Sequence, residues 1–244
     1  MKKHSPSHWA LFNVIRERLL DGLLKSVEPG MFKEMLGIAP RRNRPRSEPQ
    51  TANERYWTPW FWEVVEIHAT LDRLDQILTY LSHYPGNKAF RGRSEADWLR
   101  YHIEFYLQEI YVLRERLRRF LKKVEKAAVD ARDKSGVSAT RVLKTGVELS
   151  LKNVVFIRAG HVHHYRFDDE ELKKLDGIVL ITNIRQFGVF RPLRELQYQK
   201  TMVKFRQQLR RNNREIRKLC VRIFEDTTKI LVRNEPSGLP TLPR

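Results

Sequence analysis

Residues 57–81 read WTPWFWEVVEIHATLDRLDQILTYL, and the spacing of the large apolar side chains in this stretch decides the fold class. These side chains recur at alternating intervals of three and four residues, which places them on one face of an α-helix. The stripe consists of Trp57, Trp60, Val64, Ile67, Leu71, Leu74, Leu78 and Leu81. The sequence therefore predicts a long helix with one buried face.

The block that follows repeats this pattern. Its stripe consists of Leu99, Ile103, Tyr106, Ile110, Leu113, Leu117, Phe120 and Val124. Ser94 stands where an N-cap residue is expected, and Asp97 supplies a carboxylate three residues later, in the first turn. Because Pro85 and Gly86 interrupt the chain between the two stripes, we expect the two helices to fold back as an antiparallel hairpin.

Two more helices are predicted in the middle of the chain. One covers residues 139–157 and ends at Gly160, which can adopt the left-handed conformation that closes a helix. Asp168 is then expected to cap a short helix, with Glu171 three residues later in its first turn. The inward-facing side chains of this short helix are predicted to be Leu172, Leu175 and Ile178, and Val179–Thr182 is its last turn.

The last block, from Pro192 to Arg233, is predicted to be one long helix, since proline is favoured in a first turn. Its stripe consists of Leu196, Met202, Phe205, Leu209, Ile216, Leu219, Ile223 and Ile230. Asn212 interrupts this stripe, and either it is buried and fixes the register of a neighbouring helix or it lies beside solvent. Strand signals are weak, so the predicted fold is all-α, a helical bundle with long antiparallel helices and an extended C-terminal helix.

Composition restricts the kind of protein. The 244 residues include 47 Lys and Arg against 29 Asp and Glu, and the net charge of +18 favours a polyanionic partner. A hydrophobic content of 41% is enough for a core and excludes general disorder. One cysteine, Cys220, excludes a disulfide framework and favours a cytoplasmic location. Charges at residues 16–18 interrupt the apolar stretch 9–24, so no signal peptide, membrane span or membrane partner is expected.

Clusters of proline and glycine divide the chain into four predicted parts. Residues 1–36 form an N-terminal helical segment, 37–53 a basic proline-rich linker, 54–233 the helical bundle and 234–244 a flexible tail.

Basic residues are concentrated in the last helix. Arg206, Arg210, Arg214 and Arg217 recur at intervals of four, four and three, and we expect them to share the face opposite the apolar stripe. The candidate nucleic-acid-binding residues are these four together with Lys204, Arg211 and Lys218. A row of guanidinium groups can follow a phosphate backbone without reading its sequence. The alternative is an ordinary solvated helix face.

The stretch RAGHVHHYR, residues 158–166, differs chemically from the rest of the chain. It contains three of the eight histidines, His161, His163 and His164, beside Arg158 and Tyr165. Imidazole titrates near neutral pH without any perturbation, which suits it to proton transfer. Cleavage of RNA needs little more, because the ribose 2′-hydroxyl is the nucleophile and an arginine can stabilise charge on the phosphate.

Arg158, His163 and Tyr165 match the R-x4-H-x-Y pattern, and the region of about residues 139–181 resembles the HepT-like ribonucleases of the HEPN superfamily. The resemblance implies an α-helical, HEPN-like bundle over residues 54–233 that cleaves RNA without a metal or cofactor and is of the toxin or phage-defence type. It further implies catalytic sites at a homodimer interface, with Arg158 stabilising the phosphate and His163 acting as acid and base. Tyr165 would be the tyrosine that a cognate antitoxin, a nucleotidyltransferase, modifies.

The chain departs from this family at one position and allows other interpretations. The family usually has a polar residue after the arginine, where this chain has Ala159, and His161 or His164 is a candidate to replace it. A metal site would need His161 and His163 with Asp168 or Asp169. The histidines could also cap the helix end structurally. The rival function is a non-catalytic helical module that binds nucleic acid or protein.

Overall fold

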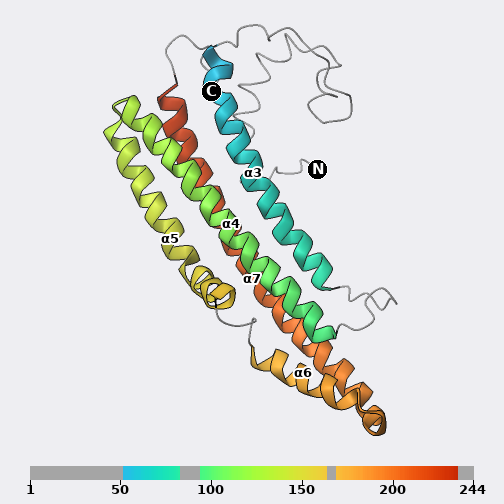
Figure 1. Cartoon of the computed structure of the whole chain (residues 1–244). Helices are drawn as coiled ribbons and strands as arrows, with labels where there is room; N and C mark the ends of the chain where they lie inside the picture. The colour runs from blue at the N-terminus through green and yellow to red at the C-terminus, as the bar shows by residue number, and fades with distance from the viewer. Residues whose placement is uncertain (1–51, 83–93, 164–168, 236–244) are drawn as a thin grey trace, which may run out of the picture. The chain divides into compact units, whose positions relative to one another are not determined.

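The computed structural model describes residues 52–82, 94–163 and 169–235 (Figure 1). These residues form five α-helices and one 3₁₀ helix, and no strand occurs among them. The elements are α3 (Ala52–Leu81), α4 (Glu95–Asp130), α5 (Lys134–His163), α6 (Glu170–Thr182), η3 (Arg185–Phe190) and α7 (Arg191–Arg233). The predicted all-α helical bundle is confirmed. The predicted N-terminal helical segment, nearly all of the basic linker and all but the first two residues of the tail lie outside the described residues.

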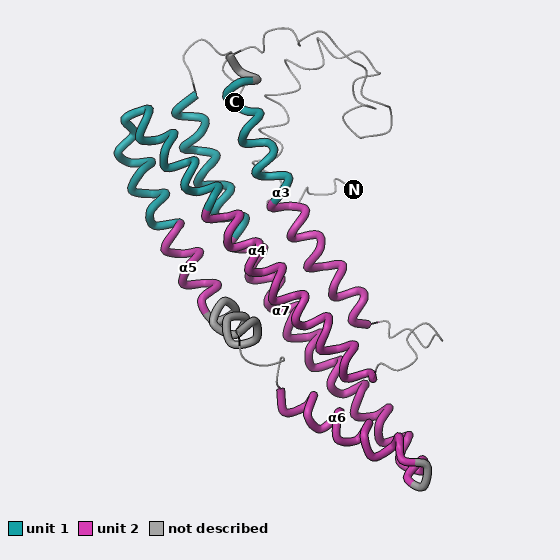
Figure 2. Tube along the Cα trace, in the orientation of Figure 1, with its two compact units in different colours: residues 1–66, 119–143, 220–244 teal, residues 67–118, 144–219 magenta. Residues whose placement is uncertain are grey.

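The chain divides into two compact units, coloured separately in Figure 2. The described part of unit 1 comes from the start of α3, the end of α4, the start of α5 and the end of α7. Unit 2 contains residues 67–118 and 144–219, which include α6 and η3. Each unit has its own buried core.

The core of unit 1 is built on aromatic side chains. The ring of Trp60 in α3 meets Phe120 of α4 edge to face at 6.2 Å between centroids, and Phe120 meets Phe224 of α7 at 6.1 Å. Edge-to-face contacts suit the charge distribution of aromatic rings. Nearby, Glu63 is buried and pairs with Arg119 at 3.0 Å and Lys123 at 2.6 Å, so its charge is compensated.

The first two predicted stripes are confirmed by burial. All eight stripe positions of α4 are buried, as are all those of α3 except Leu78, beside which Ile77 is buried instead. The predicted cap is also confirmed: Ser94 Oγ accepts from the Asp97 amide at 3.1 Å, and the Ser94 amide donates to Asp97 Oδ2 at 3.3 Å. This reciprocal pair satisfies two amides that α4 would otherwise leave unpaired.

The stripe predicted for α7 needs correction at two positions. Leu196 is 68% exposed, so its assignment to the buried face was wrong, and Leu219 is half-buried beside the fully buried Cys220. At the interruption of the stripe, Asn212 is half-buried and its neighbour Asn213 is the buried asparagine. The other six stripe positions of α7 are buried as predicted, so the shift by one residue is confined to positions 212–213 and 219–220.

Candidate nucleic-acid site at the ends of α5 and along α7

Three of the candidate catalytic residues, Arg158, His161 and His163, belong to α5, which is longer than predicted. It begins at Lys134 and continues through Gly160 to His163, so the predicted limits of 139–157 and the helix end at Gly160 were wrong. Glycine permits a left-handed closing residue but does not require one, and here the helix continues through it. At the other end, Asp133 Oδ1 accepts from the Gly136 amide at 2.9 Å and starts the helix.

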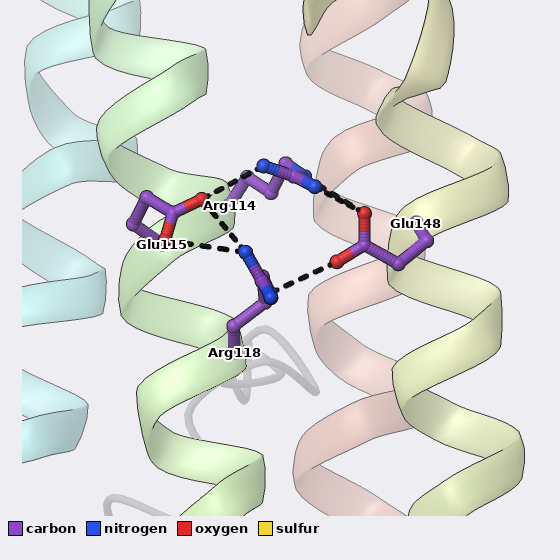
Figure 3. Close-up of polar contacts among 4 residues, drawn as sticks. All are labelled: Arg114, Glu115, Arg118 and Glu148. Carbon is purple, nitrogen blue, oxygen red and sulfur yellow. Dashed lines mark hydrogen bonds and ion pairs between the residues drawn. The ribbon is translucent and has the colours of Figure 1, made fainter.

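Ion pairs hold α5 against α4 in unit 2 (Figure 3). Glu148 of α5 accepts from Arg114 Nε at 3.0 Å and pairs with Arg118 Nε at 3.0 Å. Arg114 also pairs with Glu115 at 2.7 Å, so the two arginines share two carboxylates. Such a network orients α5 ten residues before Arg158, although exposed pairs of this kind add little stability individually.

Part of the predicted catalytic set lies on described backbone. Arg158, His161 and His163 lie in the last turns of α5, but their side chains lie outside the described part of the structure. His164 and Tyr165 lie outside the described residues altogether. The convergence of Arg158 and His163 on one phosphate therefore stays a prediction.

The helix after the motif is capped one residue later than predicted. The N-cap of α6 is Asp169 rather than Asp168, and its Oδ1 accepts from the Glu171 amide at 2.9 Å. Asp169 has the extended backbone that an N-cap requires, with φ −131° and ψ 143°. On the inward face, Leu172 and Leu175 are buried as predicted, whereas Val179 takes the place expected for Ile178.

Polar contacts attach α6 to α7. Lys204 of α7 pairs with Asp169 at 3.4 Å, and Gln197 Nε2 donates to Glu171 Oε2 at 2.9 Å. The hydrogen bond from Gln197 lowers the pKa of Glu171, and the charge of Lys200 adds to the effect. The chain that leaves the motif is thus anchored to α7 at the first residues of α6.

The predicted row of arginines does not lie opposite the buried stripe of α7. Arg206 and Arg217 are half-buried at its edge, and Arg217 forms an ion pair with Asp75 of α3. Arg210 and Arg214 point farther outward and are exposed, as is Arg211. The predicted position was wrong because each arginine directly follows a buried residue, and one residue along an α-helix is a rotation of about 100° rather than 180°.

The predicted nucleic-acid-binding residues consequently fall into two groups. Lys204 and Lys218 pair with carboxylates, Lys218 with Glu215 at 2.9 Å. Arg210, Arg211 and Arg214 form no ion pair with any residue that the structure describes. We call this second group, which is exposed on α7, the arginine face.

Sequence reasoning missed a polar chain in unit 2 beside the arginine face, which runs from buried Tyr106 through buried Asn213 to exposed Asp75. Tyr106 Oη donates to Asn213 Oδ1 at 2.7 Å, and Asn213 Nδ2 donates to Asp75 Oδ1 at 2.9 Å. Burial raises the pKa of Tyr106, and the negative charge of Asp75 raises it further. The adjacent asparagines 212 and 213 were the available signal, since a polar residue in a heptad stripe can fix register.

Two other findings concern metals and membranes. Among the described residues, no three His, Cys, Asp or Glu side chains are placed to bind a metal ion. The alternative site at His161 and His163 lies outside the described side chains. None of the described helices combines the length and the apolar character needed to cross a membrane.

No protein-family model matches this chain, and no curated protein or solved structure matches it either.

Proposed function

We propose that this protein is a HEPN-like, metal-independent endoribonuclease. In the proposed reaction the 2′-oxygen attacks the adjacent phosphorus, the new O2′–P bond replaces the P–O5′ bond, and the strand is cut. His163 accepts the proton from the 2′-hydroxyl or delivers one to the 5′-oxygen, and Arg158 stabilises the charge on the phosphate. His161 or His164 supplies the polar group that Ala159 lacks, and Tyr165 is the position for regulatory modification.

The observation that carries this proposal is the R-x4-H-x-Y pattern at the C-terminal end of α5. The helix is long and firmly packed before this point: Val147 is fully buried and Glu148 is held by two arginines of α4. The turns of α5 that precede the motif are thus held firmly against α4. The arginine face of α7 supports the choice of a polyanionic substrate, because exposed guanidinium groups attract phosphates.

The test is cleavage of a labelled single-stranded RNA in the presence of EDTA. His163→Ala and Arg158→Ala should each reduce the cleavage rate roughly 100-fold or more, the usual size of a general acid–base contribution. Arg141→Ala is the matched control, since Arg141 lies on the same helix and is 71% exposed. Undiminished cleavage in both site variants would show that the activity lies elsewhere. Activity that EDTA abolishes would favour a metal-dependent hydrolase.

A second candidate is a non-catalytic helical module that binds nucleic acid. The exposed Arg210, Arg211 and Arg214 favour it, since binding through these residues requires nothing from the histidines. Under this proposal the wild-type protein binds RNA without cutting it, and His163→Ala leaves the affinity unchanged. An RNA-binding protein with no cleavage activity under any metal condition would establish this alternative.

A further inference from the structure

Aromatic side chains gather in unit 2, where the end of α3 lies beside the start of α4 (Figure 1). The ring of His102 in α4 contacts Trp98 at 4.2 Å and Tyr101 at 5.3 Å between centroids. It also stacks on Tyr80 of α3 at 6.3 Å, and Phe105 joins the cluster through Tyr101 at 6.4 Å. We call these five rings the aromatic platform.

The platform has a buried base and an exposed surface. His102 is 6% exposed, whereas Tyr80, Tyr101 and Phe105 are 55%, 56% and 38% exposed. Because Tyr80 and Tyr101 rest on a buried ring, their positions are supported by packing while much of their surface stays open to solvent. Side chains that are already held in place lose little freedom when they bind a ligand.

Two rings of the platform are aligned with each other. Tyr101 and Phe105 are four residues apart on α4, and their planes differ by only 15°. Their centroids lie 6.4 Å apart, close to twice the spacing of about 3.4 Å between successive bases of one nucleic-acid strand. At this separation the two rings do not cover each other's faces, so both can accept another flat ring.

The platform itself is uncharged at neutral pH. Burial lowers the pKa of His102, and neither of its ring nitrogens has a hydrogen-bond partner among the described residues, so it contributes a neutral ring. Two carboxylates of the same stretch of α4 are already paired, Asp97 with Arg100 at 3.3 Å and Glu109 with Arg73 at 2.7 Å. The platform therefore offers ring faces without charge, which suits nucleobases rather than phosphates.

We propose that the aromatic platform stacks unpaired bases of a single-stranded RNA whose phosphates contact the arginine face. The inference rests on the proposed binding of RNA and specifies its form, since a duplex keeps the faces of its bases stacked on one another. Stacking on aromatic side chains tolerates any sequence, because every base has a π-face.

One hydrogen bond between α4 and α7 relates the platform to the arginine face. Phe105 directly precedes Tyr106, whose hydroxyl donates to Asn213, and Asn213 directly precedes Arg214. The two surfaces therefore lie at the same level along the two helices of unit 2. A strand that is held by its phosphates at the arginine face thus has the platform at that level for its bases.

The test compares two labelled strands of about ten nucleotides by fluorescence anisotropy. One is single-stranded RNA with 2′-O-methyl groups, which lacks the attacking 2′-hydroxyl and cannot be cut, so binding is measured independently of catalysis. The other has the same sugar–phosphate backbone without bases. The wild-type chain should bind the strand with bases roughly 10-fold or more tightly, because only that strand can stack.

The double variant Tyr101→Ala/Phe105→Ala should lose most of this preference. Its affinity for the base-free strand and its salt dependence should stay as in the wild type, because no phosphate contact is removed. Trp62→Ala is the matched control, since Trp62 is 51% exposed on α3 but belongs to unit 1, and it should keep the preference. Tyr101→Phe retains the ring and should also bind as the wild type does.

Equal affinity of the wild-type chain for the two strands would overturn the proposal and leave the platform to a protein partner. This comparison needs no variant, so it holds even where a substitution disturbs folding. A preference that the double variant retains would overturn the proposal as well. Base stacking in a chain that cleaves no RNA would contradict only the nuclease, and cleavage without any preference for bases would contradict only the platform.

Discussion

Tyr106 is the residue on which unit 2 depends most for a specific polar contact. Its side chain is fully buried in α4, and its hydroxyl satisfies Asn213 of α7. Asn213 in turn binds Asp75 of α3, so one chain of hydrogen bonds connects three helices. A polar chain of this kind allows one register of the helices and disfavours the neighbouring ones.

Replacing Tyr106 by phenylalanine should therefore destabilise the protein. The change leaves the Asn213 carbonyl buried without its donor, and we expect the free energy of unfolding to fall by about 1–3 kcal/mol. Tyr101→Phe is the control, because Tyr101 is 56% exposed and its loss should change stability by less than about 0.5 kcal/mol. Urea denaturation followed by circular dichroism measures both values. Equal effects of the two substitutions would show that the hydrogen bond to Asn213 is unimportant.

The same variant has a distinct pH dependence. Burial and the charge of Asp75 raise the pKa of Tyr106, and burial with the charge of Glu235 raises the pKa of Tyr56 to about 12. Since tyrosine in an unfolded chain ionises near pH 10, the unfolded state loses its proton first, and stability falls as pH rises above about 10. We expect a shallower fall in Tyr106→Phe than in the wild type. Parallel stability curves would contradict the raised pKa.

At the scale of elements, the turn between α4 and α5 is much tighter than the sequence suggested. The sequence predicted that the helix after α4 begins at residue 139, whereas only residues 131–133 between α4 and α5 are non-helical. The amides of Arg132 and Asp133 donate to the carbonyls of Val129 at 2.9 Å and Ala128 at 2.8 Å, the two bonds of a Schellman motif. Arg132 takes the left-handed position of this motif, with φ 57°.

Arg132→Gly should stabilise the protein. Glycine adopts the left-handed conformation without the steric cost that arginine bears. Its larger conformational entropy in the unfolded chain offsets part of this benefit, and we expect the free energy of unfolding to rise by about 0.5–1 kcal/mol. Arg132→Ala keeps the strain and should bring no gain. Thermal and urea denaturation measure both changes. An equal gain in both variants would show that removal of the charge, and not of backbone strain, is responsible.

Gly136 lies in the first turn of α5, which begins at Lys134. A Cβ at this position would lie 2.5 Å from Asp133 Oδ2 and 3.1 Å from Ile230 Cγ2 of α7. The glycine is therefore present because α5 starts close to its own cap and to a neighbouring helix. Sequence alone could not distinguish this role from a turn, because the close neighbour Ile230 lies 94 residues away.

At the scale of the whole molecule, a net charge of +18 attracts RNA to the surface in general. Binding through the arginine face therefore has to be distinguished from attraction by the total charge. Arg210→Glu/Arg214→Glu should weaken RNA binding and reduce the slope of log affinity against log salt by roughly 1.4, because two phosphate contacts to a single strand are lost. Fluorescence anisotropy of a labelled single-stranded RNA over a series of NaCl concentrations measures the slope.

Lys122→Glu/Lys126→Glu is the matched control for this experiment. Both lysines are exposed on α4, and the substitutions lower the net charge by the same amount. The control should retain most of the wild-type slope. Equal losses in the two double variants would mean that total charge, rather than the arginine face, governs binding.

The sequence alone determined the class of structure and most of its helices. Stripes at intervals of three and four identified the buried faces of α3 and α4, and the Ser94–Asp97 cap followed from local chemistry. Tertiary structure decided which of two neighbouring residues is buried. Ile77 is buried instead of Leu78, Val179 instead of Ile178, and Asn213 instead of Asn212. Adjacent candidates of this kind fit a stripe almost equally well, so the position of the partner helix selects among them. For the same reason the sequence located a basic helix, whereas only packing showed that Arg217 is engaged by Asp75 and that Arg210 and Arg214 face outward.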